Sequence, residues 1–391
     1  MESKRRIEQA RRPDRERARK PERVVRKVGS NEVRADRSGR VREIRSSDGL
    51  RIRRGVRSDR VVERSYSDGR RVVSTGRRAG YSERSYGRYH GRDYYRRTYY
   101  YGGHRHSCAY RRSYWGGNPF FVYASPFYFR PRFYFWAYTP WVAPVQYDWG
   151  WAPTPWYGYY RSYFVPAPVY PTPALWLTDF LIAESLRVAY ETRPVHVAAA
   201  PPPVQHTTAV ALTPEVKQAI AVEVEAQLRE QQEAAESAES TAQYSEEDAS
   251  IPALDPSVSV FVVSENLFVA TLDGEECELS SGDVLSRIDD APDEDGNLQV
   301  RVAASKAGNC EVGTKPLVQL ADLQEMHNQF RAQVDVGLKK LASGEKGLPA
   351  APTTETIPGE VPPPPVDDVE TEVMEIQQEA DRVELAVAPE Q

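Results

Sequence analysis

The sequence predicts a mixed fold, mainly β with a few helices, in which long parts of the chain are disordered. Three observations support this: paired Asp-Gly turns among Val- and Arg-rich runs, an aromatic stretch broken by prolines, and a set of short strands with tight turns. We expect a charged disordered or helical arm at 1–32, an Arg/Tyr-rich β-hairpin segment at 33–114, and an aromatic/Pro-rich segment ending in a helix at 115–191. These are followed by a linker at 192–254 that contains a helix at 214–232, a small β-barrel plus helix at 255–342, and an acidic Pro-rich disordered tail at 343–391.

Charge is distributed very unevenly along the chain. The formal net charge is −5, yet residues 1–112 hold about 35 basic and about 14 acidic side chains, a net charge of about +21. The remaining residues therefore carry about −26. The two halves can attract each other within or between chains, and the basic half can attract an anionic partner. The sequence leaves both explanations open.

Two similar turns organise the start of the segment 33–114. Asp48-Gly49 and Asp68-Gly69 each stand between runs rich in Val, Ile, Leu and Arg. Asp-Gly between β-favouring runs is a strong short-range signal for a hairpin, because both turn positions tolerate a positive φ. These turns predict a small β-meander decorated with arginines.

Residues 81–114 are rich in Tyr, Arg, Gly and Ser, and every Lys or Arg between Lys27 and Lys217 is an arginine. A guanidinium group stacks on aromatic rings and pairs with carboxylates or phosphates in a way that an ammonium group does not. This composition predicts internal Arg–Tyr stacking, binding of nucleic acid or another polyanion, or assembly with other chains. No sequence pattern of a specific nucleic-acid-binding fold is present.

His104, His106 and Cys108 alternate along the chain. On a strand these three side chains share one face, and their chemistry suits Zn or Cu. His90 is the only candidate for a fourth ligand nearby. A metal site is one hypothesis, and a chance clustering of histidines in an aromatic tract is the other.

The stretch from Trp115 to Trp176 contains all seven tryptophans of the chain, separated by prolines and glycines. Because proline interrupts helices and central strands, we expect extended pieces whose rings pack on proline rings. This stretch either covers the protein's own core or a sister subunit, binds sugars, bases or Pro-rich peptides, or is disordered and self-associates. The binding hypothesis assigns Trp136, Trp141, Trp149, Trp151, Trp156 and Tyr157 to that surface.

Two helices follow the aromatic stretch. The first is expected over Leu175–Tyr190, where Asp179, Glu184 and Arg187 predict that it lies on the surface. The second begins at Thr213-Pro214, a hydroxyl N-cap followed by proline at the first helical position. We expect no membrane span in the first of these helices, nor in the aromatic stretch, where Arg130, Arg132, Asp148 and the prolines interrupt every apolar window.

Cys277 and Cys310 lie in the same expected domain, whereas Cys108 stands apart. A bridge between the first two would close a loop of about 33 residues and stabilise the fold by about 3 to 4 kcal/mol in the chain-entropy model. Two free buried thiols are the alternative. A disulfide would favour an oxidising compartment.

Residues 255–342 contain five or six short strands separated by tight turns, which predicts a small barrel followed by a helix. The succession Gly274, Cys277-Glu278-Leu279, Gly282-Asp283-Val284-Leu285 and Val300-Arg301-Val302 resembles bacterial SH3-like domains. The resemblance implies a small β-barrel that binds a partner.

No nucleophile elbow, phosphate-binding loop, dinucleotide fingerprint or zinc-protease motif is present, so we expect no enzymatic activity and no cofactor. We expect a structural or binding protein of the bacterial envelope that engages a protein or a cell-surface polymer and self-associates. The alternative is an intracellular nucleic-acid or polyanion binder that uses residues 1–112. The first twenty residues hold no apolar signal-peptide core. A periplasmic or surface location is therefore expected only if translation starts further upstream, and a cytoplasmic one otherwise.

Overall fold

The computed structural model describes residues 24–35, 39–54, 60–76, 79–192, 211–239, 251–306, 309–344 and 347–387. Most of the arm expected at 1–32 and much of the linker expected at 192–254 lie outside these residues. The last part of the arm differs from the expectation, since strands β1 (Val24–Val28) and β2 (Asn31–Ala35) pair there. The described chain is mixed, with helices packed against antiparallel sheets.

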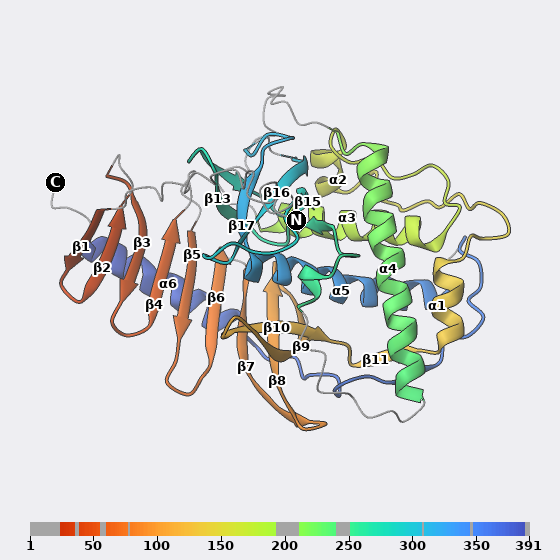
Figure 1. Ribbon diagram of the computed structural model, residues 1–391, viewed down its shortest axis with the longest axis horizontal. Helices are drawn as coiled ribbons and strands as arrows, with labels where there is room; N and C mark the ends of the chain where they lie inside the picture. The colour runs from red at the N-terminus through yellow and green to blue at the C-terminus, as the bar shows by residue number, and fades with distance from the viewer. Residues whose placement is uncertain are drawn as a thin grey trace, which may run out of the picture.

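The larger sheet has ten strands in strict sequence order, from β1 to β10 (Figure 1). Its remaining strands are β3 (Val41–Ser46), β4 (Leu50–Arg54), β5 (Arg60–Ser65), β6 (Arg71–Gly76), β7 (Ala79–Tyr89), β8 (Arg92–Tyr101), β9 (His104–Trp115) and β10 (Asn118–Ala124). Both expected Asp-Gly turns occur, between β3 and β4 and between β5 and β6. Gly49 has a φ of 95°, and a Cβ there would lie 2.6 Å from the carbonyl oxygen of Ser65. Only glycine fits this turn.

One face of this sheet is apolar and is covered by α6 (Glu370–Val387), which Figure 1 shows lying across β1–β6. Val33, Ile52 and Val62 of the sheet form one core cluster with Val373 and Ile376 of the helix. The sequence predicted a disordered tail here, and the structure differs. Strand alternation places the Val and Ile side chains on one face, and α6 supplies an apolar stripe that removes them from water.

Ion pairs attach the same C-terminal segment to the arginines that flank the apolar face. Arg54 lies 2.6 Å from Glu384, Arg70 lies 2.7 Å from Glu372, and Arg96 lies 2.9 Å from Asp367. Much of the charge asymmetry seen in the sequence is therefore satisfied within one chain. Strand β18 (Thr356–Pro358) extends this attachment by pairing with β11 (Phe127–Phe129).

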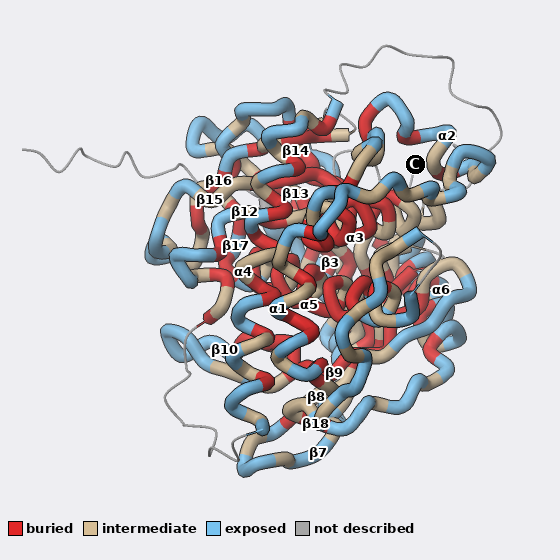
Figure 2. Tube along the Cα trace, turned by 90° about the vertical axis from the view of Figure 1, so that its right-hand side faces the viewer, coloured by how far each residue is buried: buried red, intermediate tan, exposed pale blue. Residues whose placement is uncertain are grey.

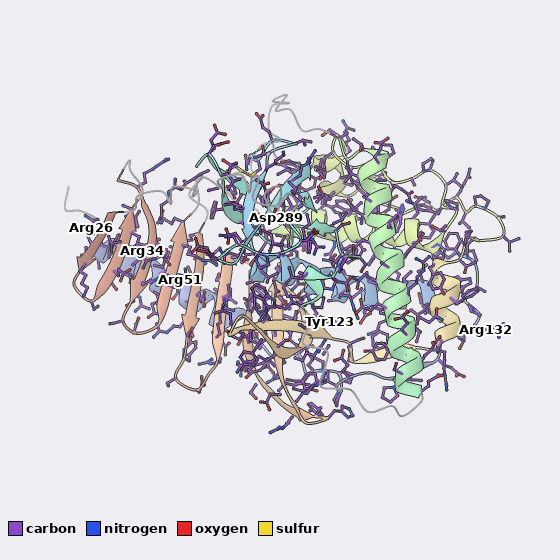
Figure 3. The ribbon with its side chains drawn as sticks, viewed as in Figure 1. Arg26, Arg34, Arg51, Tyr123, Arg132 and Asp289 are labelled. Atoms are coloured by element: carbon purple, nitrogen blue, oxygen red, sulfur yellow. A yellow bond between two sulfur atoms is a disulfide. The ribbon has the colours of Figure 1, made fainter. Side chains whose placement is uncertain are left out.

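The opposite face of the outer strands carries a ladder of arginines and glutamates. Glu43 is only 5 % exposed and accepts hydrogen bonds from Arg34 at 3.2 Å, from Arg45 at 2.9 Å and from Arg51 at 2.6 Å. Figure 3 labels Arg34 and Arg51 on these strands, together with Arg26 on β1, at the outer end of the sheet. Alternation therefore gives this sheet one apolar and one charged face.

Five helices build the central core among the described residues: α1 (Pro131–Tyr138), α2 (Pro155–Tyr160), α3 (Pro173–Glu191), α4 (Pro214–Glu239) and α5 (Leu320–Ala342). The helix expected on the surface, α3, is buried along most of its length, as the tube in Figure 2 shows. Asp179 explains the difference, because its fully buried carboxylate accepts hydrogen bonds from Ala167 N and Tyr170 and lies 2.7 Å from Lys217 Nζ. These partners make a charged residue compatible with the interior.

The smaller sheet has six antiparallel strands in the order β12-β15-β16-β17-β13-β14. They are β12 (Val260–Val262), β13 (Leu267–Thr271), β14 (Glu276–Leu279), β15 (Val284–Arg287), β16 (Asn297–Ala304) and β17 (Pro316–Gln319), and a 3-10 helix at Pro252–Leu254 precedes them. Their apolar side chains form a second core that continues into α5 through Leu323 and Met326. The likeness of this unit to SH3-like domains stays a prediction. None of the described helices has the length and apolar character needed to cross a membrane.

The contact between α6 and the large sheet gives a stability prediction. We expect Ile376→Ala, which empties a side-chain site that is 1 % exposed, to lower the free energy of unfolding by about 2 to 5 kcal/mol. The control is Met374→Ala on the same helix, whose side chain is 45 % exposed, and we expect a change within about 0.5 kcal/mol. Urea denaturation followed by circular dichroism measures both. Equal effects of the two variants would contradict the packing of α6.

Candidate ligand-binding cleft

The six aromatic residues that the sequence assigned to a binding surface lie in or against the central core. Trp141 and Trp156 are buried, and the rings of Trp136, Trp149, Trp151 and Tyr157 are partly buried and packed on the core. Trp149 stacks between Trp151 and Trp176, with ring centroids 4.2 Å and 4.8 Å apart. Turns at the prolines and glycines fold the segment back on itself, so that these rings pack on each other and on α3. This packing agrees with the hypothesis that the stretch covers the protein's own core, and the assignment of these six residues to a binding surface stays a prediction.

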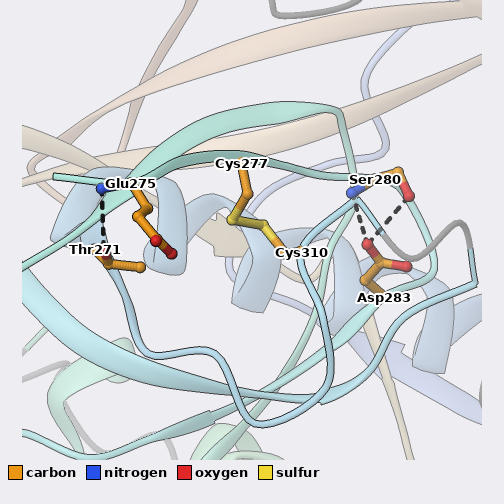
Figure 4. Close-up of a disulfide and its surroundings, with 6 residues drawn as sticks. All are labelled: Thr271, Glu275, Cys277, Ser280, Asp283 and Cys310. Atoms are coloured by element: carbon orange, nitrogen blue, oxygen red, sulfur yellow. Dashed lines mark hydrogen bonds between the residues drawn. A yellow bond between two sulfur atoms is a disulfide. The ribbon is translucent and has the colours of Figure 1, made fainter. Parts of the chain in front are cut away.

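The two cysteines that the sequence paired are bonded in the structure (Figure 4). The Sγ atoms of Cys277 and Cys310 are 2.01 Å apart, and the bridge links β14 to the segment that follows β16. Asp283 lies nearby and accepts a hydrogen bond from the backbone N–H of Ser280 at 2.8 Å. The bridge and this turn fix the edge of the smaller sheet that faces α3.

A cleft of about 1070 Å³ lies where the large sheet, α3, α5 and the smaller sheet meet. The strands β7–β9, the β12–β13 connection and α5 form its inner wall, and residues of α6 form one end. His104 and Val336 line the cleft and are exposed, which shows that it opens to solvent. No local pattern in the sequence predicted this cleft, because its walls come from several segments that are distant in the chain.

Aromatic rings from three neighbouring strands form one wall. The strand register pairs Tyr81 with Tyr99 and Tyr99 with His106, so these side chains share a face of the sheet. His106 stacks on Tyr99 with centroids 5.0 Å apart, and Tyr101 stacks on Tyr99 at 6.0 Å. We call Tyr81, Tyr99, Tyr101 and His106 the ring wall.

A buried ion pair holds the ring wall against α5. Arg97 is 3 % exposed and donates to Glu83 at 2.5 Å and to Glu325 at 2.6 Å. The ring of Tyr81 lies 5.0 Å from its guanidinium carbon. Burial raises the pKa of Glu325, but the charge of Arg97 and several hydrogen bonds outweigh burial and hold that pKa below its ordinary value. Glu325 is therefore an ionised, fully hydrogen-bonded anchor.

Glu265 is different from the other carboxylates on the cleft wall. It lies in the connection between β12 and β13, is partly buried, and forms no hydrogen bond or ion pair within the described part of the chain. Burial, followed by repulsion from Glu325 and Asp322, raises its pKa to about 7, and attraction from Arg53 and Arg71 offsets less than this. Nothing in the local sequence Ser264-Glu265-Asn266 marks this residue as special.

The three residues of the predicted metal site share the cleft-facing side of β9, as alternation required. Cys108 is buried, and burial raises the pKa of its thiol to about 12. His106 is exposed at the strand surface, and partial enclosure by its neighbours lowers the pKa of its imidazole. Among the described residues, no group of three or more His, Cys, Asp or Glu side chains is arranged to hold a metal ion. The metal hypothesis therefore gains no further ligand from the fold.

The states of the three thiols can be measured together. At pH 8 we expect iodoacetamide to label Cys108 in the folded protein on the order of 10³-fold more slowly than in the unfolded protein, because few thiolates form at a pKa of about 12. Cys277 and Cys310 should stay unlabelled, even after unfolding, until a reductant is added. Peptide mass spectrometry distinguishes the three sites. Labelling of all three without reductant would contradict the bridge.

Glu265 gives a prediction on pH and stability. The pKa of Glu265 is about 7 in the folded protein and about 4.5 in the unfolded protein. Between these pH values the folded state holds a proton that the unfolded state has lost, so the free energy of unfolding falls as pH rises through this range. We expect Glu265→Gln to be more stable than the native sequence at pH 8, by about 1 to 3 kcal/mol after screening in the accessible cleft. At pH 5 the difference should shrink to less than about 1 kcal/mol. Urea denaturation at both pH values measures this, with the exposed Glu236→Gln as control. A gain of equal size at both pH values would be inconsistent with the raised pKa.

No protein-family model, curated protein or solved structure matches this chain. A proposal for the function therefore depends on the geometry of the cleft.

Proposed function

We propose that this chain is a non-enzymatic binding protein that takes up a ligand with a flat ring in the cleft beside the ring wall. The volume of the cleft, about 1070 Å³, supports this, since pockets for small organic ligands span about 300 to 1000 Å³. Tyr99 is 1 % exposed and Arg97 lies over the ring of Tyr81. Tyr101, which is partly buried, and His106, which is exposed, are therefore the rings of the wall on which a flat ligand would stack.

Two of the titratable groups in the cleft, Glu325 and Cys108, are unsuited to catalysis. A general base or nucleophile needs a free lone pair within reach of the substrate. The oxygens of Glu325 accept hydrogen bonds from Arg97, Tyr99 and Gln329, which commits them to the fold. The thiol of Cys108 stays protonated at neutral pH, because burial raises its pKa.

The cellular part of the proposal is an oxidising compartment, namely the periplasm or the bacterial cell surface. The Cys277–Cys310 bridge supports it, because disulfides persist in such compartments. The ligand would then belong to an envelope protein or a cell-surface polymer. The smaller sheet takes part, since Val262, Phe268 and Glu278 line the same cleft.

The alternative is binding of nucleic acid or another polyanion by the arginines of the N-terminal half. The ion pairs of Arg54, Arg70 and Arg96 with the C-terminal segment use charges that such a partner would need. A phosphate backbone would have to displace these carboxylates, which weakens affinity. We therefore favour the cleft.

A blocked cleft tests the proposal. The probes are tryptophol, tryptamine and indole-3-propionate, three indoles that differ in side-chain charge, measured by equilibrium dialysis. We expect at least one probe to bind with 1:1 stoichiometry, and Val336→Trp, which fills the cleft from α5, to weaken it at least tenfold. The matched control is Val222→Trp on α4, because Val222 is 58 % exposed, Val336 is 56 % exposed, and only Val336 lines the cleft. Absence of binding, or binding that Val336→Trp leaves unchanged, would overturn the proposal.

A further inference from the structure

Lys306 differs from the arginines that line the cleft. Each of these arginines forms an ion pair with a carboxylate: Arg54, Arg60, Arg105 and Arg187. Lys306 also lines the cleft and is half-buried, but it forms no ion pair within the described part of the chain. Its amine donates to the hydroxyl of Ser280 at 2.8 Å. Because a lysine side chain has further N–H donors, this one contact leaves the amine able to engage a ligand.

Ser280 joins this amine to a buried carboxylate. The hydroxyl of Ser280, which accepts from Lys306, donates to Oδ2 of Asp283 at 3.1 Å. Asp283 is 0 % exposed, and its carboxylate also accepts the backbone N–H of Ser280 at 2.8 Å and that of Lys306 at 2.9 Å. The three side chains therefore form a continuous path along which a proton can pass from the amine to the carboxylate.

The fold fixes this group in place. The bridge between Cys277 and Cys310 joins the two segments that carry it, since Cys277 precedes Ser280 by three positions and Cys310 follows Lys306 by four (Figure 4). The ring centre of Tyr160 lies 5.9 Å from the amine. At Gly282 a Cβ would lie 3.8 Å from Cδ of Lys306, so the stem of the lysine packs against this turn. Such packing holds the amine at one position on the cleft wall.

The surroundings also favour an uncharged amine. Burial lowers the pKa of Lys306, although Asp283 and Glu278 attract its charge. Burial raises the pKa of Asp283, although Lys306 and several hydrogen bonds oppose this. Both shifts favour the state in which the proton has moved to the carboxylate. A neutral lysine amine carries a free lone pair, and buried lysines with this property form imines with carbonyl compounds.

We propose that Lys306 binds an aromatic aldehyde covalently in the cleft, as an imine, while Ser280 and Asp283 carry the proton. The lone pair of Nζ forms a bond to the carbonyl carbon, and the carbonyl oxygen becomes a hydroxyl. Asp283 then returns its proton through Ser280, the hydroxyl leaves as water, and a protonated imine remains beside the carboxylate. This inference goes beyond the proposed function, since it adds a reversible covalent bond and does not depend on the ring wall.

Reductive trapping tests the proposal in the full-length protein. The probe is 2-naphthaldehyde at pH 7 with sodium cyanoborohydride, which reduces the imine to a stable secondary amine, and peptide mass spectrometry follows each lysine. The internal control is Lys339, which also lines the cleft, is exposed, and lies 4.2 Å from the ring centre of Phe127. We expect Lys306 to be labelled at least tenfold faster than Lys339, although Lys306 is the less exposed of the two.

The proton path gives a second measurement. We expect Ser280→Ala to slow the labelling of Lys306 at least fivefold, because the amine then has no hydroxyl that connects it to Asp283. The matched control is Ser281→Ala, which removes a hydroxyl from the next residue. Ser281 also lines the cleft and is 8 % exposed, against 6 % for Ser280, and its replacement should leave the rate within about twofold. Circular dichroism verifies the folding of both variants, and the comparison of Lys306 with Lys339 needs no variant.

The outcomes separate this inference from the proposed function. If Lys306 reacts no faster than Lys339, or if Ser280→Ala and Ser281→Ala change the rate equally, the inference is wrong. The proposed function then stands or falls with the indole probes, which bind without a covalent step. If Lys306 is labelled selectively but no indole binds, the covalent site stands and the proposed function falls.

Discussion

Attraction between the arginine-rich sheet and the carboxylates of the C-terminal half is the interaction on which the rest of this structure depends. It acts at the surface, where α6 lies across the sheet, and in the interior, where Arg97 joins Glu83 of β7 to Glu325 of α5. Removing one partner of the interior pair destabilises the fold more than removing one partner of a surface pair, because it leaves an uncompensated charge in the interior. Arginine suits this role, since its planar guanidinium group can pair with two carboxylates and stack on Tyr81 and Tyr110 at the same time.

The position of the cleft follows from this interaction. Arg97 of the large sheet binds Glu325 of α5, and the cleft lies where the large sheet, α3, α5 and the smaller sheet meet. Side chains alternate between the two faces of a strand, and the face of the large sheet that lines the cleft carries Tyr81, Tyr99, Tyr101 and His106. The cleft is thus a consequence of how three layers are spaced, and its chemistry is a consequence of strand register.

Local sequence patterns predicted the elements with a local cause. The Asp-Gly turns, the helix that begins at Pro214 and the helix that continues to Leu341 each depend on neighbours within a few positions. The structure differs from the prediction where the cause is distant. The sequence predicted that Asp179 lies on the surface, because no local pattern identifies its partners Lys217 and Tyr170. The sequence predicted disorder for the C-terminal segment because the segment is acidic and Pro-rich. Its apolar stripe of Val373, Ile376 and Ala380 is stabilising only when it packs on the large sheet. Glu265 could not be found at all, since its environment is set by Glu325, sixty positions further on, and by Arg53 and Arg71 from the other sheet.

The distance along the chain between α6 and the strands that it covers has a consequence for biosynthesis. A ribosome synthesises the ten strands well before the helix that covers their apolar face, and Arg60 pairs with Glu384, which follows it by 324 positions. At about 5 to 20 residues per second, the nascent sheet spends tens of seconds with Val33, Ile52 and Val62 uncovered. A chaperone that binds this apolar face would protect the nascent chain from aggregation, and a product truncated before α6 would expose an apolar sheet.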